Sequence, residues 1–226
     1  MESKLIGIAG GMGPKATSDL FSRIIERTPA NCDQEHYEIM VYNNPKIPDR
    51  SNAILNGGKN PKNEIVNTCQ RLEQSGSDFI IIPCNTAHYY YDEIQSEIKI
   101  PIINMIKITA EYLNKQSFNK VGIIGTKATL KSRLYQKELE MFNIDAFIPD
   151  NIDYIMEMIY DIKKGEKPRD LSNKKIVKTL NNLIEKQVEA IVLGCTELSY
   201  FFKEVGTMNI QVPLIDPIDL LIDYLK

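Results

Sequence analysis

The sequence lacks the features that are typical of nucleic-acid-binding proteins and of membrane proteins. Its 226 residues include 27 Lys and Arg against 30 Asp and Glu, a net charge of −3, so no excess of positive charge is available to hold phosphates. No apolar run approaches the roughly 18 to 20 residues that span a bilayer. The longest candidate, Phe79–Pro83, has the length of a strand. We therefore expect neither a nucleic-acid partner nor a membrane partner.

Closely spaced cysteine pairs are absent as well. The four cysteines, Cys32, Cys69, Cys84 and Cys195, are far apart and form no Cys-x-x-Cys motif, which argues against a zinc ribbon and a disulfide framework. We expect reduced thiols and no metal site. Met1–Leu5 has neither the apolar core nor the cleavage site of a signal peptide, so we expect a cytoplasmic protein.

The composition is that of an ordinary globular chain, with 43% hydrophobic and 25% charged residues. Short apolar runs predict strands, and helical spacing of apolar residues predicts the helices between them. The order β-α-β-α indicates parallel sheets flanked by helices. The predicted strands are Leu5–Ala9, Tyr37–Tyr42, Phe79–Ile82, Val121–Ile124 and Ala190–Leu193; the predicted helices are Pro14–Glu26, Asn63–Gln74, Ala87–Glu97, Leu130–Phe142, Ile176–Lys186 and Ile218–Leu225.

The two halves of the chain repeat each other. Lys4–Gly10 is similar in sequence to Lys120–Gly125, and Asp78–Thr86 is similar to Glu189–Thr196. In the second pair, each segment consists of an acidic residue, a predicted strand and a cysteine followed by polar residues. No flexible Gly/Ser linker separates the halves. We therefore expect an α/β fold of two pseudo-symmetric lobes, each a mostly parallel sheet flanked by helices, with the active site in the cleft between them. The expected lobes are residues 1–104 plus 212–226, and residues 105–211.

The repeat places one cysteine at the same point of each lobe. Cys84 and Cys195 each follow a strand and precede a helix N-terminus, which is where open α/β sheets bind ligands and where a thiolate is stabilised. Two thiols on opposite sides of one carbon can act as base and acid and so invert a stereocentre. The alternative, a small buried apolar residue, is the interpretation we give to Cys69; Cys32 belongs to a polar loop.

The first turn, Gly10–Ala16, formally fits a dinucleotide fingerprint. The strand that should end in a ribose-binding acid runs instead into Asn43, so we expect no nicotinamide cofactor. A tight turn with Pro14 at the first helical position leaves backbone N–H groups free for a carboxylate.

Three further sites carry charged or titratable side chains. Arg50, in a proline-stiffened loop, could fork onto a carboxylate or could be a solvated surface residue. His88, four residues after Cys84, could lower the pKa of that thiol or cap the helix. One of Lys163 and Lys164 could supply a second cation for a diacid, or both could belong to a solvated helix end.

Taken together, these motifs resemble the cofactor-independent aspartate/glutamate racemase family, and within it the aspartate racemases. The likeness covers nearly the whole chain and rests on four motifs in order: Gly10–Pro14, Asn43–Arg50, Pro83–His88 and Gly194–Leu198. It implies two pseudo-symmetric α/β domains, no pyridoxal phosphate or other cofactor, and Cys84 and Cys195 as the paired acid and base.

The resemblance also implies a substrate and its binding residues. The substrate would be a small acidic amino acid, aspartate or also glutamate, and the family suggests a homodimer. The opening Gly10–Met12 stands where glutamate racemases usually carry Asp-Ser-Gly, which disfavours glutamate as the substrate. The implied substrate-binding residues are Met12, Arg50, Asn85, Thr86, Thr196 and Lys163.

Two other functions remain open from the sequence. The same scaffold with paired cysteines resembles that of maleate isomerases and arylmalonate decarboxylases, in which a thiol attacks or protonates a dicarboxylate. A non-catalytic carboxylate-binding module is the third candidate, and intact thiols at both positions argue against it.

Overall fold

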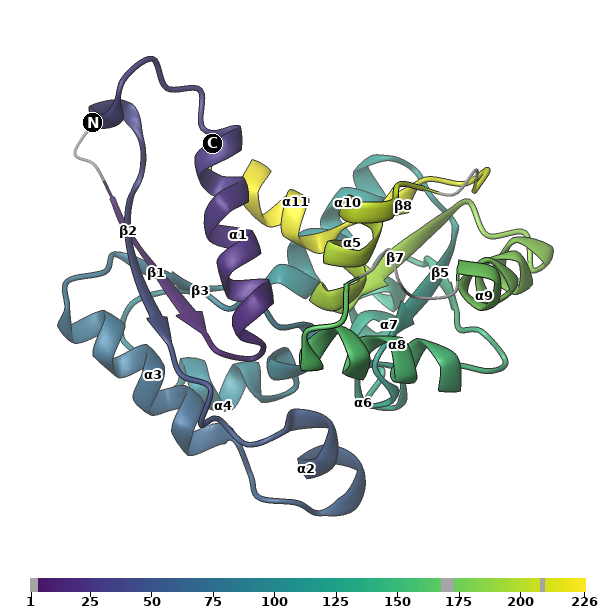
Figure 1. Cartoon of the computed structure of the whole chain (residues 1–226), viewed down its shortest axis with the longest axis horizontal. Coiled ribbons are helices and arrows are strands. Elements are labelled where there is room, and N and C mark those ends of the chain that lie inside the picture. The colour runs from purple at the N-terminus through teal and green to yellow at the C-terminus, as the bar shows by residue number, and fades with distance from the viewer. Residues whose placement is uncertain (1–3, 168–172, 208–209) are drawn as a thin grey trace. The chain divides into compact units, whose positions relative to one another are not determined.

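Each half of the chain forms its own sheet of parallel strands (Figure 1). The structure is a computed structural model that describes residues 4–167, 173–207 and 210–226; residues 1–3, which enter the signal-peptide argument, lie outside it. The strand order is β2-β1-β3-β4 in the first sheet and β6-β5-β7-β8 in the second, so both halves have the same topology. The α/β fold with two similar lobes is therefore confirmed.

The first unit comprises Met1–Met105 and Ile222–Lys226. Its apolar core lies where α3 and the segment after β3 cover one side of the sheet, and includes Ile65, Leu72, Ile80 and Ile94. The elements of this unit are β1 (Leu5–Gly10), α1 (Pro14–Arg27), η1 (Asp33–Glu35), β2 (Glu38–Asn43), α2 (Arg50–Asn56), α3 (Lys62–Gln74), β3 (Phe79–Ile81), η2 (Asn85–Tyr90), α4 (Tyr91–Gln95) and β4 (Ile102–Ile103).

The second unit is Ile106–Leu221. Two clusters of buried apolar residues form its core, one including Ile159, Leu183 and Phe201 and the other including Leu113 and Tyr135. Its elements are α5 (Met105–Lys115), β5 (Lys120–Gly125), α6 (Lys127–Lys131), α7 (Leu134–Glu140), β6 (Asp145–Phe147), α8 (Asp153–Lys164), α9 (Asn173–Glu185), β7 (Ala190–Gly194), α10 (Thr196–Val205), β8 (Leu214–Ile215) and α11 (Pro217–Tyr224), which runs into the first unit.

A glycine in the middle of each first strand explains part of the repeat. A Cβ added at Gly7 of β1 would lie 3.2 Å from the Cβ of Leu72 in α3, and one added at Gly122 of β5 would lie 2.9 Å from Cδ1 of Leu183 in α9. In each unit, a helix therefore packs so closely against the backbone of the first strand that a residue without a side chain is needed at the contact. This packing explains why glycine recurs in the Ile-Gly-Ile and Val-Gly-Ile patterns of the two strands.

The structure differs from the expectation at the end of the second lobe. Residues 212–221, expected in the first lobe, belong to the second unit, because Leu214 and Ile215 of β8 pair with Ile191 and Val192 of β7. Strand pairing over such a distance in sequence leaves no local signal. The chain returns to the first unit only at Ile222.

Smaller differences concern helices. The helix expected over Ala87–Glu97 is a 3-10 helix, η2, followed by the short α4, and the one expected over Leu130–Phe142 is divided between α6 and α7. The division falls near Arg133, whose φ of 58° lies in the left-handed region that a helix interior does not use. The loop expected over residues 43–51 ends earlier, since α2 begins at Arg50.

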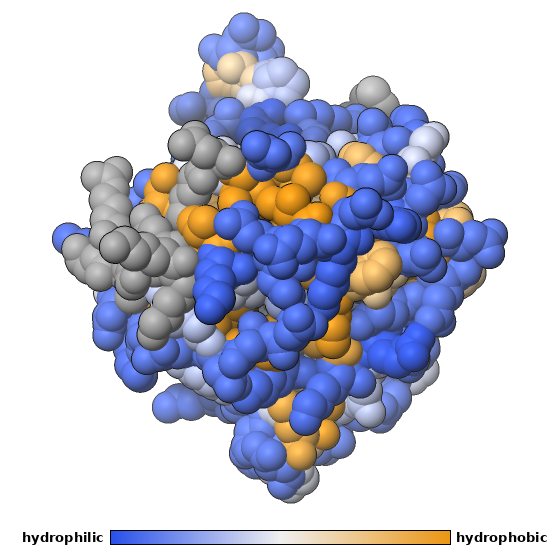
Figure 2. Space-filling view, turned by 90° about the vertical axis from the view of Figure 1, so that its right-hand side faces the viewer, coloured by the Kyte–Doolittle hydropathy of each residue, from blue (hydrophilic) through white to orange (hydrophobic). Residues whose placement is uncertain are grey.

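Figure 2 shows one face on which hydrophilic residues predominate and apolar residues form separate patches. Among the helices of the described ranges, none combines the length and the apolar character needed to cross a membrane.

Candidate active site

Cys84 and Cys195 occupy equivalent places, each just after the third strand of its unit. Cys84 is the N-cap of η2 and Cys195 the N-cap of α10, and both have extended backbones. Their exposed fractions are 6% and 5%, and both are free thiols. The main-chain carbonyl of each accepts hydrogen bonds from the following turn, Ala87 for Cys84 and Leu198 for Cys195. Each unit therefore holds one buried thiol where a strand meets a helix.

The first turn of the chain is pressed against the segment that follows β2. Gly11 has a φ of 97°, and a Cβ there would lie 2.2 Å from the main-chain oxygen of Asn44. The N–H of Asn44 also donates to the carbonyl of Gly10 at 3.2 Å. Only glycine fits this crossing of two backbones. The contact joins the Gly10–Pro14 and Asn43–Arg50 motifs and fixes Met12, which is 3% exposed.

Arg50 is buried at the start of α2, with an exposed fraction of 7%. Its Nη1 donates to the carbonyl of Pro48 at 3.0 Å and, at 3.4 Å, to that of Ile47, while Nη2 donates to the carbonyl of Met12 at 3.0 Å. Its Nε is buried and makes no hydrogen bond to the described residues. Arg50 thus ties its own loop to the first turn and keeps an Nε–H donor, so the interpretation as a solvated surface residue is wrong.

His88 is buried and bonds to backbone on both sides of its ring. Its Nδ1 lies 2.9 Å from the carbonyl oxygen of Cys84, and the N–H of Met105 donates to its Nε2 at 3.3 Å. Burial lowers the pKa of His88. The neutral tautomer with a proton on Nδ1 satisfies both contacts. His88 therefore holds the backbone of Cys84 and the first residue of α5.

Asn85 and Thr86 directly follow Cys84, and Thr196 directly follows Cys195. Asn85 and Thr86 begin η2 and are 2% and 5% exposed, and Thr196 begins α10 and is 4% exposed. These short polar side chains lie at helix N-termini, where main-chain N–H groups lack helical partners and favour an anion.

The thiol of Cys195 donates a hydrogen bond to the carboxylate of Glu197, a residue of the Gly194–Leu198 motif to which the sequence alone assigns no role. Its Sγ lies 2.9 Å from Oε2 of Glu197. Burial, and then the charge of Glu197, raise the pKa of Cys195 well above its usual range, while the charge of Lys163 lowers it. Glu197 is itself 5% exposed.

The two adjacent lysines at the end of α8 have different surroundings. Lys163 acts electrostatically on Cys195, and its Nζ lies 5.6 Å from the ring centre of Tyr160. Lys164 makes an ion pair with Asp161 at 3.0 Å, which raises the pKa of Lys164. Of the two, Lys163 is therefore the cation that influences a thiol.

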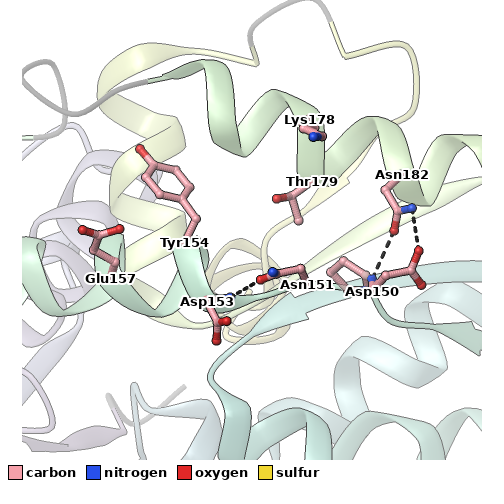
Figure 3. Close-up of a pocket in the computed structure, with 9 residues that line it drawn as sticks. Asp150, Asn151, Asp153, Tyr154, Glu157, Lys178, Thr179 and Asn182 are labelled. Carbon is pink, nitrogen blue, oxygen red and sulfur yellow. Dashed lines mark hydrogen bonds between the residues drawn. The ribbon is translucent and has the colours of Figure 1, made fainter.

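A pocket of the second unit lies between α8 and α9 and does not include Cys195 (Figure 3). Asp150 and Asn182 hydrogen-bond to each other there, and the N–H of Asp153 donates to Asn151 at 2.8 Å. Much of its polar lining is thus already paired within the protein. Its lining residues are Pro149, Asp150, Asn151, Asp153, Tyr154, Glu157, Lys178, Thr179 and Asn182.

No metal centre is formed by the described residues, in which no three His, Cys, Asp or Glu side chains come together as a ligand set.

Two units of identical strand order, each with a buried cysteine after its third strand, define a duplicated α/β protein with one buried thiol in each half. The model of the family described as Asp/Glu/hydantoin racemase matches residues 9–225. The chain therefore belongs to the Asp/Glu/hydantoin racemase family and is an isomerase, as the sequence resemblance predicts.

Relatives agree with this assignment. The chain is similar to the aspartate racemase of Picrophilus torridus, with 34% identity, a TM-score of 0.81 and coverage of 98% of this chain and 92% of that one. It is 28% identical to the broad specificity amino-acid racemase RacX of Bacillus subtilis, over 94% of this chain and 92% of the relative. It is 30% identical to the glutamate racemase of Aquifex pyrophilus, but spans only 58% of that protein's length.

Proposed function

We propose that the protein interconverts L- and D-aspartate through the thiols of Cys84 and Cys195, without a cofactor. The observation that carries the proposal is the equivalent placement of two buried, free thiols, each at the N-cap of a helix. The other two cysteines, Cys32 and Cys69, have no counterpart in the second half of the chain. The aspartate racemase of Picrophilus torridus, 34% identical to this chain, supports the choice of substrate.

The chemistry needs one thiolate and one thiol. The thiolate takes the α-proton, and the electron pair of the broken C–H bond stays on the α-carbon; the other thiol then gives its proton to the opposite face. The main-chain N–H groups at the starts of η2 and α10 would stabilise a thiolate and the negative charge that builds up on the substrate's α-carboxylate. Because each thiol can serve as acid or base, both enantiomers are substrates.

Recognition of the side-chain carboxylate is assigned to two cations. Arg50 keeps a buried Nε–H donor, and the charge of Lys163 reaches the neighbourhood of Cys195. A carboxylate accepts hydrogen bonds from guanidinium more strongly than from neutral donors. Met12, Asn85, Thr86 and Thr196 would line the rest of the amino-acid site.

Proton NMR in D2O tests the proposal. Pure protein is incubated with L-aspartate, D-aspartate or glutamate without added cofactor, and the loss of the α-proton and the appearance of the other enantiomer are followed. We expect exchange with inversion for aspartate, and a loss of about 10²-fold or more in Cys84→Ser and in Cys195→Ser. Cys69→Ala is the matched control, because Cys69 is buried inside α3 and burial raises its pKa to about 12.

Two outcomes would contradict the proposal. Full racemisation by either serine variant would remove the two-thiol mechanism. No exchange with any of the amino acids would favour a dicarboxylate isomerase or decarboxylase, for which maleate is the next substrate to test.

We also propose a homodimer in a reducing, cytoplasmic setting. Exposed apolar side chains of the first unit support a protein partner: Phe21 and Ile25 on α1 and Met40 and Val41 on the edge strand β2, each about 40% exposed. The four free cysteines support a reducing compartment. Light scattering at several protein concentrations measures the oligomeric state.

A further inference from the structure

A hydrogen bond joins the thiol of Cys195 to the carboxylate of Glu197. Both groups can become anions, and two anions in contact would repel each other. The donor is the Sγ of Cys195 and the acceptor is Oε2 of Glu197, 2.9 Å away. Thr196 directs its Oγ1 to the same oxygen at 3.4 Å. All three residues are at most 5% exposed, so water does not screen the contact effectively.

The local backbone makes this contact possible. Cys195 is the N-cap of α10 with an extended φ of −151°, and Glu197 is the second residue of the helix. An N-cap side chain folds back over the first turn, toward the side chains and N–H groups that begin the helix. The thiol therefore meets the carboxylate of Glu197, whose charge opposes the thiolate, while the main-chain N–H of the same residue acts in the opposite direction and lowers the pKa of Cys195.

Other titratable groups act on Cys195 from two neighbouring helices. Lys163, from α8, supplies a positive charge that favours the thiolate. Tyr135, from α7, is fully buried, interacts electrostatically with Cys195 and Asp216, and is hydrogen-bonded to Thr109; burial raises its pKa well above the usual range, so it is neutral. Glu197 is thus the anion in contact with the sulfur.

We propose that Glu197 is a positioning residue that holds the proton on Sγ of Cys195, so that this cysteine is the acid of the free protein. The inference rests on the proposed two-thiol function. When Cys195 gives its proton to the α-carbon, the S–H bond breaks, a C–H bond forms, and a thiolate remains beside the Glu197 carboxylate. The two like charges repel each other, which drives reprotonation of the sulfur. The two protonation forms of the free enzyme are therefore unequally populated.

Alkylation of Cys195 in the substrate-free protein tests the proton assignment directly. Iodoacetamide labelling over a range of pH, read by mass spectrometry of the Cys195 peptide, is compared in wild type and Glu197→Gln. We expect the variant to be alkylated at least about tenfold faster at neutral pH, because the thiolate no longer faces a carboxylate. Glu204→Gln, at an exposed position of the same helix, is the matched control and should follow wild type. A superimposable pH profile for Glu197→Gln would overturn the proposal.

A measurement on the wild type covers the case in which Glu197→Gln does not fold, which circular dichroism would reveal. The infrared difference spectrum between wild type and Cys195→Ser should contain an S–H stretching band at neutral pH, shifted to lower frequency by donation to a carboxylate. The absence of that band would show that Cys195 rests as a thiolate and would overturn the proposal.

Kinetics separate a positioning role from a merely structural one. A racemisation has an equilibrium constant of unity, so kcat/KM must be the same in both directions. An unequal population of the two enzyme forms therefore appears only as different kcat values and different KM values for the two enantiomers. Glu197→Gln should change the ratio of the two kcat values; an equal fall in both, with unchanged alkylation, would overturn the proposal. Because the alkylation and infrared readouts need no turnover, an absence of racemisation would refute the proposed function without refuting the proton assignment.

Discussion

The imidazole of His88 connects the carbonyl of Cys84, 2.9 Å from Nδ1, to the N–H of Met105, 3.3 Å from Nε2. Met105 is the last residue of the first unit before the chain passes into the second. The backbone that presents the Cys84 thiol is therefore tied through one neutral ring to the segment by which the chain leaves the unit. His88 has a structural role here, and no described hydrogen bond joins its ring to the sulfur.

His88 makes the stability of the protein depend on pH. Burial lowers its pKa in the folded protein, whereas the unfolded chain regains a value of about 6.5. As the pH falls below that value, the unfolded state takes up a proton that the folded state resists, so stability is full above it and is lost on acidification. His88→Gln should lower the free energy of unfolding by about 1 to 3 kcal/mol at neutral pH, because buried partners lose their bonds.

Urea unfolding at about pH 5.5 and about pH 7.5 measures this dependence. His88→Gln should lose less stability between the two pH values than wild type does. His36→Gln, at the other of the two histidines, should keep the wild-type difference. The assignment of His88 as a buried neutral ring fails if its variant keeps that difference too.

Arg50→Lys keeps a cation but cannot reproduce three bonds from one guanidinium to carbonyls of Ile47, Pro48 and Met12. We expect a loss of about 2 to 4 kcal/mol in the free energy of unfolding. KM for aspartate should also rise more than KM for a monocarboxylic amino acid. Thermal unfolding and initial rates with both substrates measure the two effects, with Arg71→Lys, at an exposed site, as the control. Equal increases in both KM values would refute a role in binding the side-chain carboxylate.

Lys163→Gln and Lys164→Gln should differ although the two residues are adjacent. Removing the Lys163 charge takes away a cation that favours the Cys195 thiolate, so alkylation of Cys195 should slow by about two- to fivefold at a fixed pH. Lys164 is paired with Asp161, and its variant should leave the rate unchanged. Labelling in low salt and in high salt checks the electrostatic origin, since salt should reduce the effect. Identical rates for the two variants would contradict the assignment.

Gly11→Ala should be far more destabilising than Gly57→Ala. Both glycines have positive φ, 97° and 64°, but a Cβ at Gly11 would lie 2.2 Å from the oxygen of Asn44, whereas a Cβ at Gly57 meets nothing within 4 Å. We expect a loss of more than about 3 kcal/mol for Gly11→Ala and about 1 kcal/mol for Gly57→Ala. Chemical denaturation measures both. Similar losses would show that the backbone crossing at Asn44 relaxes without cost.

The sequence predicts the parts of this fold that repeat. The strands around Gly7 and Gly122 and the cysteines after the third strands are visible as local patterns, because burial on both faces of a parallel sheet leaves continuous apolar runs. The place of β8 is not visible, since its pairing with β7 depends on residues far away in the chain. For this reason the sequence alone assigns residues 212–221 to the first lobe, whereas they belong to the second unit.

The candidate site is predictable in its residue types and less so in their partners. The bonds of Arg50 go to main-chain carbonyls, which have no sequence signature. The contact of Cys195 with Glu197 runs between residues two apart, which do not face each other within a helix, and it forms because Cys195 has an extended backbone at the N-cap. A carboxylate two residues after a cysteine that caps a helix is the signal that could have pointed to it.

The shared strand order of the two sheets has a consequence for how the thiols can diverge. If a protein of this kind were assembled from two identical half-length chains, every substitution beside one cysteine would appear beside the other. In a single chain that carries both halves, the neighbours change independently: the residue two places after Cys84 is Thr86, and the residue two places after Cys195 is Glu197. Joining the halves therefore permits a symmetric scaffold to hold two chemically different thiols.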